Sequence, residues 1–386
     1  MSISPGIGQP YTLHVAQDVL DDLRDRLART RLPREQAGAD WATGTPLGYA
    51  ARLRDYWLDA FDWRAWEARI NALDNRTIEI DGITLHFAVI PGSGPAPRPL
   101  LLTNGWPGSF LELIDVAERL AHPERFGGSA DEAFTVILPS LPGYGLSPPP
   151  AGPVSPERIA GLWAGLMQRL GLGRYHAFGA DWGCLVTALL ALNHPENLAG
   201  VQLTMPGLRP TIDDAAPPLT AEENAWRSGA AARIAPERGY QLVQGTKSQS
   251  LAYAHTDSPI ALACWIAEKF HGWTVPGEPV DPPFAMDDLV ANTMLYWVNG
   301  ALAPMWLYMF AGGAAPIPAG QRVAPPAAFL FSSRDLMLPA PESWLRRMYD
   351  VRRVTHAPEI GHFPGLENPA FLAGEIRAFV RETSES

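Results

Sequence analysis

Hydrophobic and polar positions follow different patterns in successive parts of the chain. Residues 18–32 and 47–72 place apolar residues about four positions apart, which predicts two amphipathic helices, the first ending at Pro33. From residue 76 onward, short apolar runs are separated by longer helical patterns. This order predicts a helical extension followed by an α/β domain.

The α/β part begins with a predicted β-hairpin. Residues 77–90 alternate around Asp81-Gly82, a dipeptide that favours a two-residue hairpin turn. Further strands are predicted at 99–105, 134–143, 174–183, 200–207, 326–335 and 351–360, and helices at 156–170, 184–194, 341–350 and 368–380. Because these strands are short and apolar and alternate with helices, they indicate a mostly parallel sheet covered by helices on both faces.

The strand–helix alternation stops near residue 208 and resumes near residue 327. The intervening block carries helical patterns at 220–233, 258–269 and 287–311, which predicts a helical lid inserted into the α/β domain. We therefore expect four parts: an N-terminal extension (1–75), a first part of the core (76–207), the lid (208–321) and a second part of the core (322–386).

Composition and charge narrow the class of protein. Of the 386 residues, 47% are hydrophobic and 18% are charged, which is ordinary for a globular protein. The net charge of −11 argues against nucleic acid or an anionic membrane as a partner. Cys184 and Cys264 are too few for a disulfide scaffold or a metal site of their own. With no signal-peptide or membrane-spanning pattern, we expect a cytoplasmic protein without a metal or a cofactor.

The strongest chemical signal is the turn Gly179-Ala180-Asp181-Trp182-Gly183, between a predicted strand and a predicted apolar helix. A Gly-x-nucleophile-x-Gly turn in this place raises its central side chain above the sheet edge. That side chain belongs to Asp181, a carboxylate, which attacks carbon without first losing a proton. An aspartate that caps the helix in a glycine-rich turn is the alternative interpretation.

An acid and a histidine follow this turn in the chain order expected of such a site. Asp335 ends the predicted strand 326–335, and His362 lies between the last predicted strand and the last helix. Glu359 is a competing acid, but it lies only three residues before His362 and not at a strand end. We interpret three other histidines as structural: His194, His271 and His356.

The loop after the strand 99–105 offers an oxyanion hole. In such sites, a backbone N–H of this loop acts together with the N–H of the residue after the nucleophile. The two candidates are Trp106 and Trp182, and Pro107 is a candidate for a cis peptide bond. A plain Gly-Pro turn is the alternative. The candidates for substrate contact are Asn104, Pro107 and Phe110.

With these motifs, the chain resembles the epoxide hydrolases of the α/β-hydrolase superfamily, in the branch of the microsomal and juvenile-hormone enzymes. The resemblance rests on NGWPGSFLELI, LPSLPGYGLS, GADWG, SSRDLMLPAPESW and GHFPGLENP in the core, with further matches in the extension and the lid. It implies an α/β-hydrolase fold and the conversion of an epoxide to a vicinal diol through a covalent ester on Asp181, without a cofactor. It also suggests a role in secondary-metabolite biosynthesis.

The resemblance further implies two lid tyrosines that hold the epoxide oxygen and protonate it as the ring opens. Tyr240 matches the first of them by position. Tyr308 is the candidate for the second, although counting along the sequence puts the family position at Met309. Tyr253 and Tyr296 are expected to pack within the lid.

Two other functions remain open. A haloalkane dehalogenase also uses an elbow aspartate followed by a tryptophan, and Asn104, which replaces the family's usual histidine, is a candidate halide ligand. A catalytically inactive binding protein on this fold is the second alternative, against which the set Asp181, Asp335 and His362 argues. We expect the substrate to be a small apolar or aromatic epoxide, and a homodimer is an open expectation.

Overall fold

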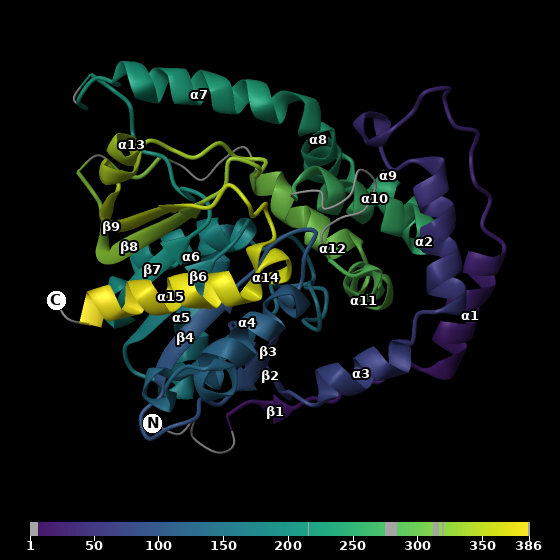
Figure 1. The fold of residues 1–386 in the computed structure, drawn as a ribbon, viewed down its shortest axis with the longest axis horizontal. Coiled ribbons are helices and arrows are strands. Elements are labelled where there is room, and N and C mark those ends of the chain that lie inside the picture. Colours follow the sequence, from purple (N-terminus) through teal and green to yellow (C-terminus); the bar gives the residue numbers. More distant parts are fainter. Residues whose placement is uncertain (1–6, 215, 275–283, 312–315, 319, 385–386) are drawn as a thin grey trace.

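A computed structural model of the chain shows a central β-sheet between layers of helices, with a further group of helices along one side (Figure 1). It describes residues 7–214, 216–274, 284–311, 316–318 and 320–384. Within these residues the sheet has nine strands in the order β1-β2-β3-β5-β4-β6-β7-β8-β9. The strands are β1 (Gln9–Pro10), β2 (Asp74–Ile80), β3 (Ile83–Ile90), β4 (Arg98–Thr103), β5 (Phe134–Pro139), β6 (Tyr175–Gly179), β7 (Leu198–Leu203), β8 (Val323–Phe331) and β9 (Tyr349–His356).

The predicted hairpin and the parallel sheet are both present. β2 and β3 pair antiparallel up to Ile80 and Ile83, and the turn residues Asp81 and Gly82 both have positive φ, 49° and 74°. Two left-handed residues are what the tight hairpin turn requires. From β5 to β9 every neighbouring pair in the sheet is parallel.

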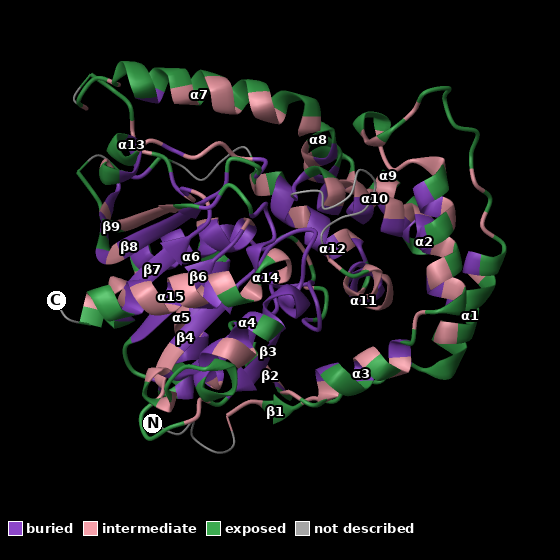
Figure 2. Cartoon of the chain, in the orientation of Figure 1, coloured by how far each residue is buried: buried purple, intermediate pink, exposed green. Residues whose placement is uncertain are grey.

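Helices cover both faces of the parallel strands. α4 (Ile114–Ala121) packs with α15 (Pro369–Ser384), and α5 (Pro156–Leu170) packs with α6 (Trp182–Asn193). Figure 1 shows α15 in front of the strands. Figure 2 shows that the sheet between these helices is largely buried, and β5 is buried at every position. This double cover is the reason why the strand sequences are continuously apolar.

The N-terminal extension differs from its prediction in two places. It contains α1 (Gln17–Ala28), α2 (Leu47–Asp59) and α3 (Trp63–Asn71). α1 ends at Ala28, before the predicted limit at Pro33, and its last buried side chain is Leu27. The single helix predicted over 47–72 is two helices, because the Asp62 side chain accepts a hydrogen bond from the Ala65 N–H and caps a new helix there.

The helices predicted for the lid are present, with two more between them. The lid helices are α7 (Ala221–Ile234), α8 (Gly239–Thr246), α9 (Ser248–Asp257), α10 (Pro259–Gly272), α11 (Met286–Asn299) and α12 (Leu302–Met305). Neither α8 nor α9 was predicted. The helix predicted over 287–311 ends at Asn299, because Gly300 follows with φ 94°. A 3₁₀ turn, Trp306–Phe310, follows α12.

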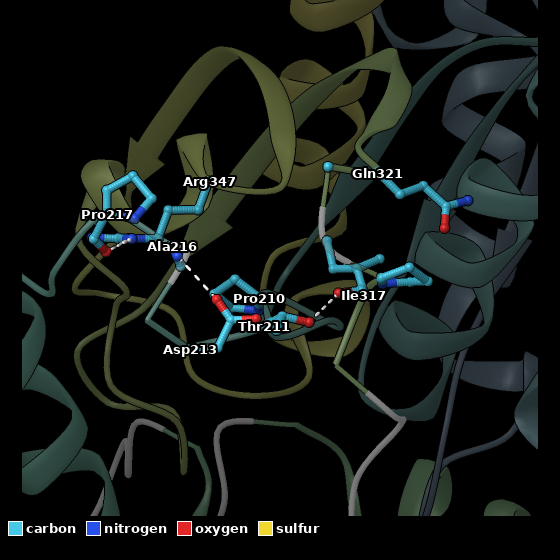
Figure 3. Close-up of a pocket in the computed structure, with 10 residues that line it drawn as sticks. Pro210, Thr211, Asp213, Ala216, Pro217, Ile317, Gln321 and Arg347 are labelled. Atoms are coloured by element: carbon cyan, nitrogen blue, oxygen red, sulfur yellow. Dashed lines mark hydrogen bonds between the residues drawn. The ribbon is translucent and has the colours of Figure 1, made fainter.

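The chain enters and leaves this helical region at neighbouring points. Pro210 forms a β-bridge with Ile317, whose N–H donates to the Arg209 carbonyl over 3.0 Å. Thr211 also donates its hydroxyl to the Ile317 carbonyl (Figure 3). Pro210, Thr211 and Ile317 line a small surface pocket together with Arg347. Hydrogen bonds thus join the segment that enters the lid to the segment that leaves it.

The last part of the chain completes the sheet and its cover. α13 (Glu342–Arg346) is shorter than the predicted helix 341–350, because β9 already begins at Tyr349. The short helix α14 (Pro364–Glu367) precedes α15. Among the described residues, no helix combines the length and the apolar character needed to span a bilayer.

Candidate active site

Asp181 lies in a tight turn between β6 and α6, with φ 52° and ψ −123°. A Cβ on Gly179 would overlap the Gly183 carbonyl, and a Cβ on Gly183 would overlap the Thr103 carbonyl. The two flanking glycines therefore permit this close approach of three backbone segments. The Asp181 side chain makes no capping hydrogen bond to α6, so the alternative of a simple helix cap does not describe it.

The structure brings the predicted acid and histidine to this turn. His362 Nδ1 lies 2.8 Å from Asp335 Oδ1, and His362 Nε2 lies 3.5 Å from Asp181 Oδ2. Asp335 comes from the loop after β8, and His362 from the segment between β9 and α14. The competing acid, Glu359, is exposed. The imidazole thus joins the two aspartates.

Charge governs the protonation of this histidine. Burial alone lowers the pKa of His362, but the nearby carboxylates of Asp335 and Asp181 outweigh burial and raise that pKa well above its ordinary value. An imidazolium between two carboxylates is therefore the favoured state when Asp181 is ionised.

The two oxygens of the Asp181 carboxylate have different neighbours. The Trp106 backbone N–H donates to Oδ1 over 2.7 Å, whereas Oδ2 is the oxygen near His362. A Cβ on Gly105 would overlap Oδ1, so the loop approaches the carboxylate as closely as glycine allows. Trp182 is the first residue of α6, and the peptide bond between Trp106 and Pro107 is cis, as predicted.

Tyr240 and Tyr308 are both buried and line the same cavity as Asp181. Their ring centroids lie 5.3 Å apart, nearly perpendicular to each other. Burial, and to a smaller degree the Asp181 charge, raises the pKa of the Tyr240 hydroxyl, and burial is also the main cause of the raised pKa of Tyr308. Both hydroxyls therefore keep their protons and are available as donors. Met309, in contrast, is 54% exposed. The residue that faces the site is therefore Tyr308 and not Met309.

The cavity in front of Asp181 has a volume of about 350 Å³. Asp181, His362 and the two tyrosines form its polar part. Its other walls are mostly apolar and include Leu185, Met205, Leu208, Trp226, Phe310, Leu336 and Trp344. A small molecule with an apolar body would fit this lining. Among the described residues, no group of three or more His, Cys, Asp or Glu side chains is arranged to hold a metal ion.

Comparison with known proteins identifies the family. Residues 8–113 match the family described as epoxide hydrolase N terminus, and residues 98–255 match the alpha/beta hydrolase fold. A putative epoxide hydrolase of Stigmatella aurantiaca is 37% identical over 97% of this chain and 84% of its own length. The chain belongs to the epoxide hydrolase family. Both the predicted fold and the predicted resemblance are thus confirmed.

Other epoxide hydrolases resemble this chain at lower sequence identity. Epoxide hydrolase 1 of Oryctolagus cuniculus is 29% identical over 96% of this chain and 88% of its own. The structure of the Aspergillus niger epoxide hydrolase superimposes with a TM-score of 0.81 at 27% identity, covering 97% of this chain and 96% of the other. These likenesses support the hydrolysis of an epoxide to a diol as the reaction of this chain.

The three predicted substrate-contact residues of this epoxide hydrolase lie outside the cavity lining. Asn104 is buried, and its side-chain amide donates to the neighbouring Gly105 carbonyl over 3.0 Å. The Pro107 carbonyl accepts a hydrogen bond from Asn292, and Phe110 is buried. None of the three is among the residues that line the cavity in front of Asp181.

Sequence reasoning missed Trp273 and Glu112. Trp273 follows α10, and its carbonyl accepts the His362 backbone N–H over 2.7 Å. Its ring contacts those of Tyr240 and His362 at centroid distances of 5.3 and 4.9 Å. Glu112 is buried behind the site, and burial raises its pKa to about 8. The family match over the segment WIAEKFHGW was the only available signal for Trp273.

Two lid tyrosines were expected to pack, and only one does. Tyr296 is buried and donates its hydroxyl to the Gly108 carbonyl over 2.7 Å, which fixes the loop after Trp106. Tyr253 is 69% exposed on α9, so its predicted packing role is wrong.

Proposed function

We propose that the protein opens a small apolar or aromatic epoxide by attack of Asp181 Oδ2 on a ring carbon. The hydrogen bond from the Trp106 N–H holds Oδ1, which leaves Oδ2 as the attacking atom. The new bond joins Oδ2 to the substrate carbon, while the bond from that carbon to the epoxide oxygen breaks. The product of this step is an ester on Asp181.

Tyr240 and Tyr308 supply the proton for the epoxide oxygen. The oxygen gains negative charge as its bond to carbon breaks, and two neutral phenols in a buried site stabilise that charge by hydrogen bonding. In the described residues the Tyr308 hydroxyl has no hydrogen-bond partner of ordinary geometry, so it is available to the substrate. One tyrosine then transfers its proton to the oxygen.

Ester formation prepares His362 for the second step. The ester removes the negative charge of Asp181, which is one of the two charges that raise the pKa of His362. His362 then releases its proton more readily and activates a water against the ester carbonyl, with Asp335 orienting the ring. The Trp106 and Trp182 N–H groups stabilise the oxyanion. Its collapse breaks the bond between the carboxyl carbon and the substrate oxygen, His362 gives that oxygen the proton it took from water, and the diol leaves. The proton that His362 released before the attack restores the tyrosine, and the second proton of the water returns to His362.

The placement of two buried tyrosines in the same cavity as the Asp181 carboxylate carries this proposal. A haloalkane dehalogenase would need a halide ligand, and the Asn104 amide instead donates to Gly105 outside the cavity lining. The apolar cavity wall supports an apolar or aromatic substrate. A role in secondary metabolism and a homodimer stay predictions.

Incubation with styrene oxide and, separately, with 1-bromobutane tests this function. We expect the vicinal diol from styrene oxide and no bromide release from 1-bromobutane. Bromide release without diol would establish the dehalogenase alternative. Neither product would support the inactive binding protein.

A further inference from the structure

Lysine is rare in this chain and one of the two lysines is buried. Among the thirty Lys and Arg residues, only Lys247 and Lys269 are lysines. Lys247 is exposed at the end of α8, but Lys269 in α10 is only 4% exposed. Burying an ammonium group is unfavourable unless other groups compensate for the lost water. The groups around the Lys269 ammonium must therefore compensate for its lost hydration, and they indicate the role of its charge.

The Lys269 ammonium lies between two carboxylates and two aromatic rings. Nζ donates to Glu237 Oε2 over 3.2 Å and also forms an ion pair with Glu268. It lies over the Tyr240 ring, 4.8 Å from the centroid, and 5.8 Å from that of Trp273. Both distances are within the range of cation–π attraction. The buried end of this lysine is therefore directed at the tyrosine of the candidate site.

Tyr240 is held by several groups at once. Trp106, whose N–H contacts Asp181, stacks on its ring at 5.0 Å and an interplanar angle of 12°. Gln241 donates to its hydroxyl over 3.1 Å. The charges of Asp181 and Glu237 both oppose ionisation of this phenol. The Lys269 ammonium lies against the same ring, with a charge opposite to that of these two carboxylates.

We propose that Lys269 is a positioning residue for ring opening, which orients Tyr240 and stabilises the charge that this ring gains. The inference rests on the proposed function. As the carbon–oxygen bond of the epoxide breaks, its electron pair stays on the oxygen, and the Tyr240 O–H proton moves to that oxygen. The phenolate left behind has a more negative ring face, to which the ammonium is more strongly attracted.

The test uses single turnovers of styrene oxide by the full-length protein. Lys269→Met removes the charge and keeps a side chain of similar length, and Lys247→Met is the matched control. We expect Lys269→Met to slow ester formation by roughly three- to thirty-fold and to leave ester hydrolysis unchanged, since Tyr240 acts only in the first step. Lys247→Met should change neither rate. Circular dichroism establishes that each variant is folded, and Lys269→Gln replaces Lys269→Met if the latter does not fold.

A double-mutant cycle separates this role from a structural one. In a Tyr240→Phe background, which has no phenol proton to transfer, Lys269→Met should slow ester formation no further. An equal slowing in both backgrounds, equal slowing of both chemical steps, or no slowing at all would overturn the role of Lys269. The absence of any ester in the wild-type protein would instead overturn the proposed function.

Discussion

The backbone N–H of Trp106 donates a 2.7 Å hydrogen bond to Oδ1 of Asp181. This bond makes the two oxygens of one carboxylate inequivalent, because the other oxygen, Oδ2, faces His362 at 3.5 Å. In the proposed mechanism, Oδ1 becomes the carbonyl oxygen of the ester and Oδ2 attacks carbon.

Substitution of Asp181 and substitution of His362 should stop the reaction at different steps. Asp181→Ala removes the attacking carboxylate and should abolish diol formation. His362→Gln retains the carboxylate but has no base, so the protein should form the ester and accumulate it. Intact-mass measurement after incubation with styrene oxide would show the added substrate mass. Diol production by Asp181→Ala at the wild-type rate would refute the covalent role.

The tyrosines should act in ester formation. Loss of one donor to an oxyanion costs about 2.7–4 kcal/mol in comparable sites, which corresponds to a rate loss of roughly 10²–10³-fold. We expect losses of this order in single-turnover ester formation for both Tyr240→Phe and Tyr308→Phe. Tyr253→Phe, at the exposed position on α9, is the control and should react as the wild type does. An unaffected Tyr308→Phe would remove that residue from the site.

Gly105 should tolerate no side chain. A Cβ there would overlap Asp181 Oδ1, so Gly105→Ala should displace the loop or the carboxylate and reduce turnover by at least about tenfold, equivalent to about 1.4 kcal/mol. Gly161→Ala in α5 is the control, because a Cβ at that position meets no atom within 4 Å. Comparison of diol formation and melting temperature in the two variants would test this prediction. Equal activity of both would contradict the close approach.

Glu112 should make stability depend on pH. Burial raises the pKa of its carboxyl from 4.5 to about 8, so the folded state retains a proton that the unfolded chain has lost between these two values. Glu112 should therefore reduce stability as pH rises through this window, by up to about 1.4 kcal/mol per pH unit. Glu112→Gln should remove this decline, as measured by urea unfolding between pH 5 and 8. Parallel pH profiles of the wild type and the variant would contradict the prediction.

The features that the sequence predicted well are local ones. The turn around Asp181 follows from glycines on both sides of one residue between a strand and a helix, and the Asp81-Gly82 hairpin follows from two neighbouring residues. The helix predicted over 47–72 failed because a single cap at Asp62 divides an otherwise continuous apolar pattern. The pattern records which side chains are buried, but it does not record where a helix is interrupted.

Contacts between distant segments could not be predicted in the same way. Lys269 and Trp273 reach Tyr240 only because α8 and α10 fold together, and no spacing along the chain encodes that contact. The contact of Asn104 with substrate stays a prediction, and the hydrogen bond from its amide to the adjacent Gly105 carbonyl could not be read from the sequence. Counting alone could not choose between Tyr308 and Met309, whose directions depend on the 3₁₀ turn after α12.

The source of the oxygen in the diol tests the central claim most directly. In the ester route, the oxygen added to the substrate comes from Asp181, and water replaces it on the enzyme. A single turnover of styrene oxide with excess enzyme in ¹⁸O-water should therefore give unlabelled diol and an ¹⁸O label in the peptide that contains Asp181. Labelled diol in the first turnover, with an unlabelled peptide, would show direct attack by water and contradict the covalent mechanism.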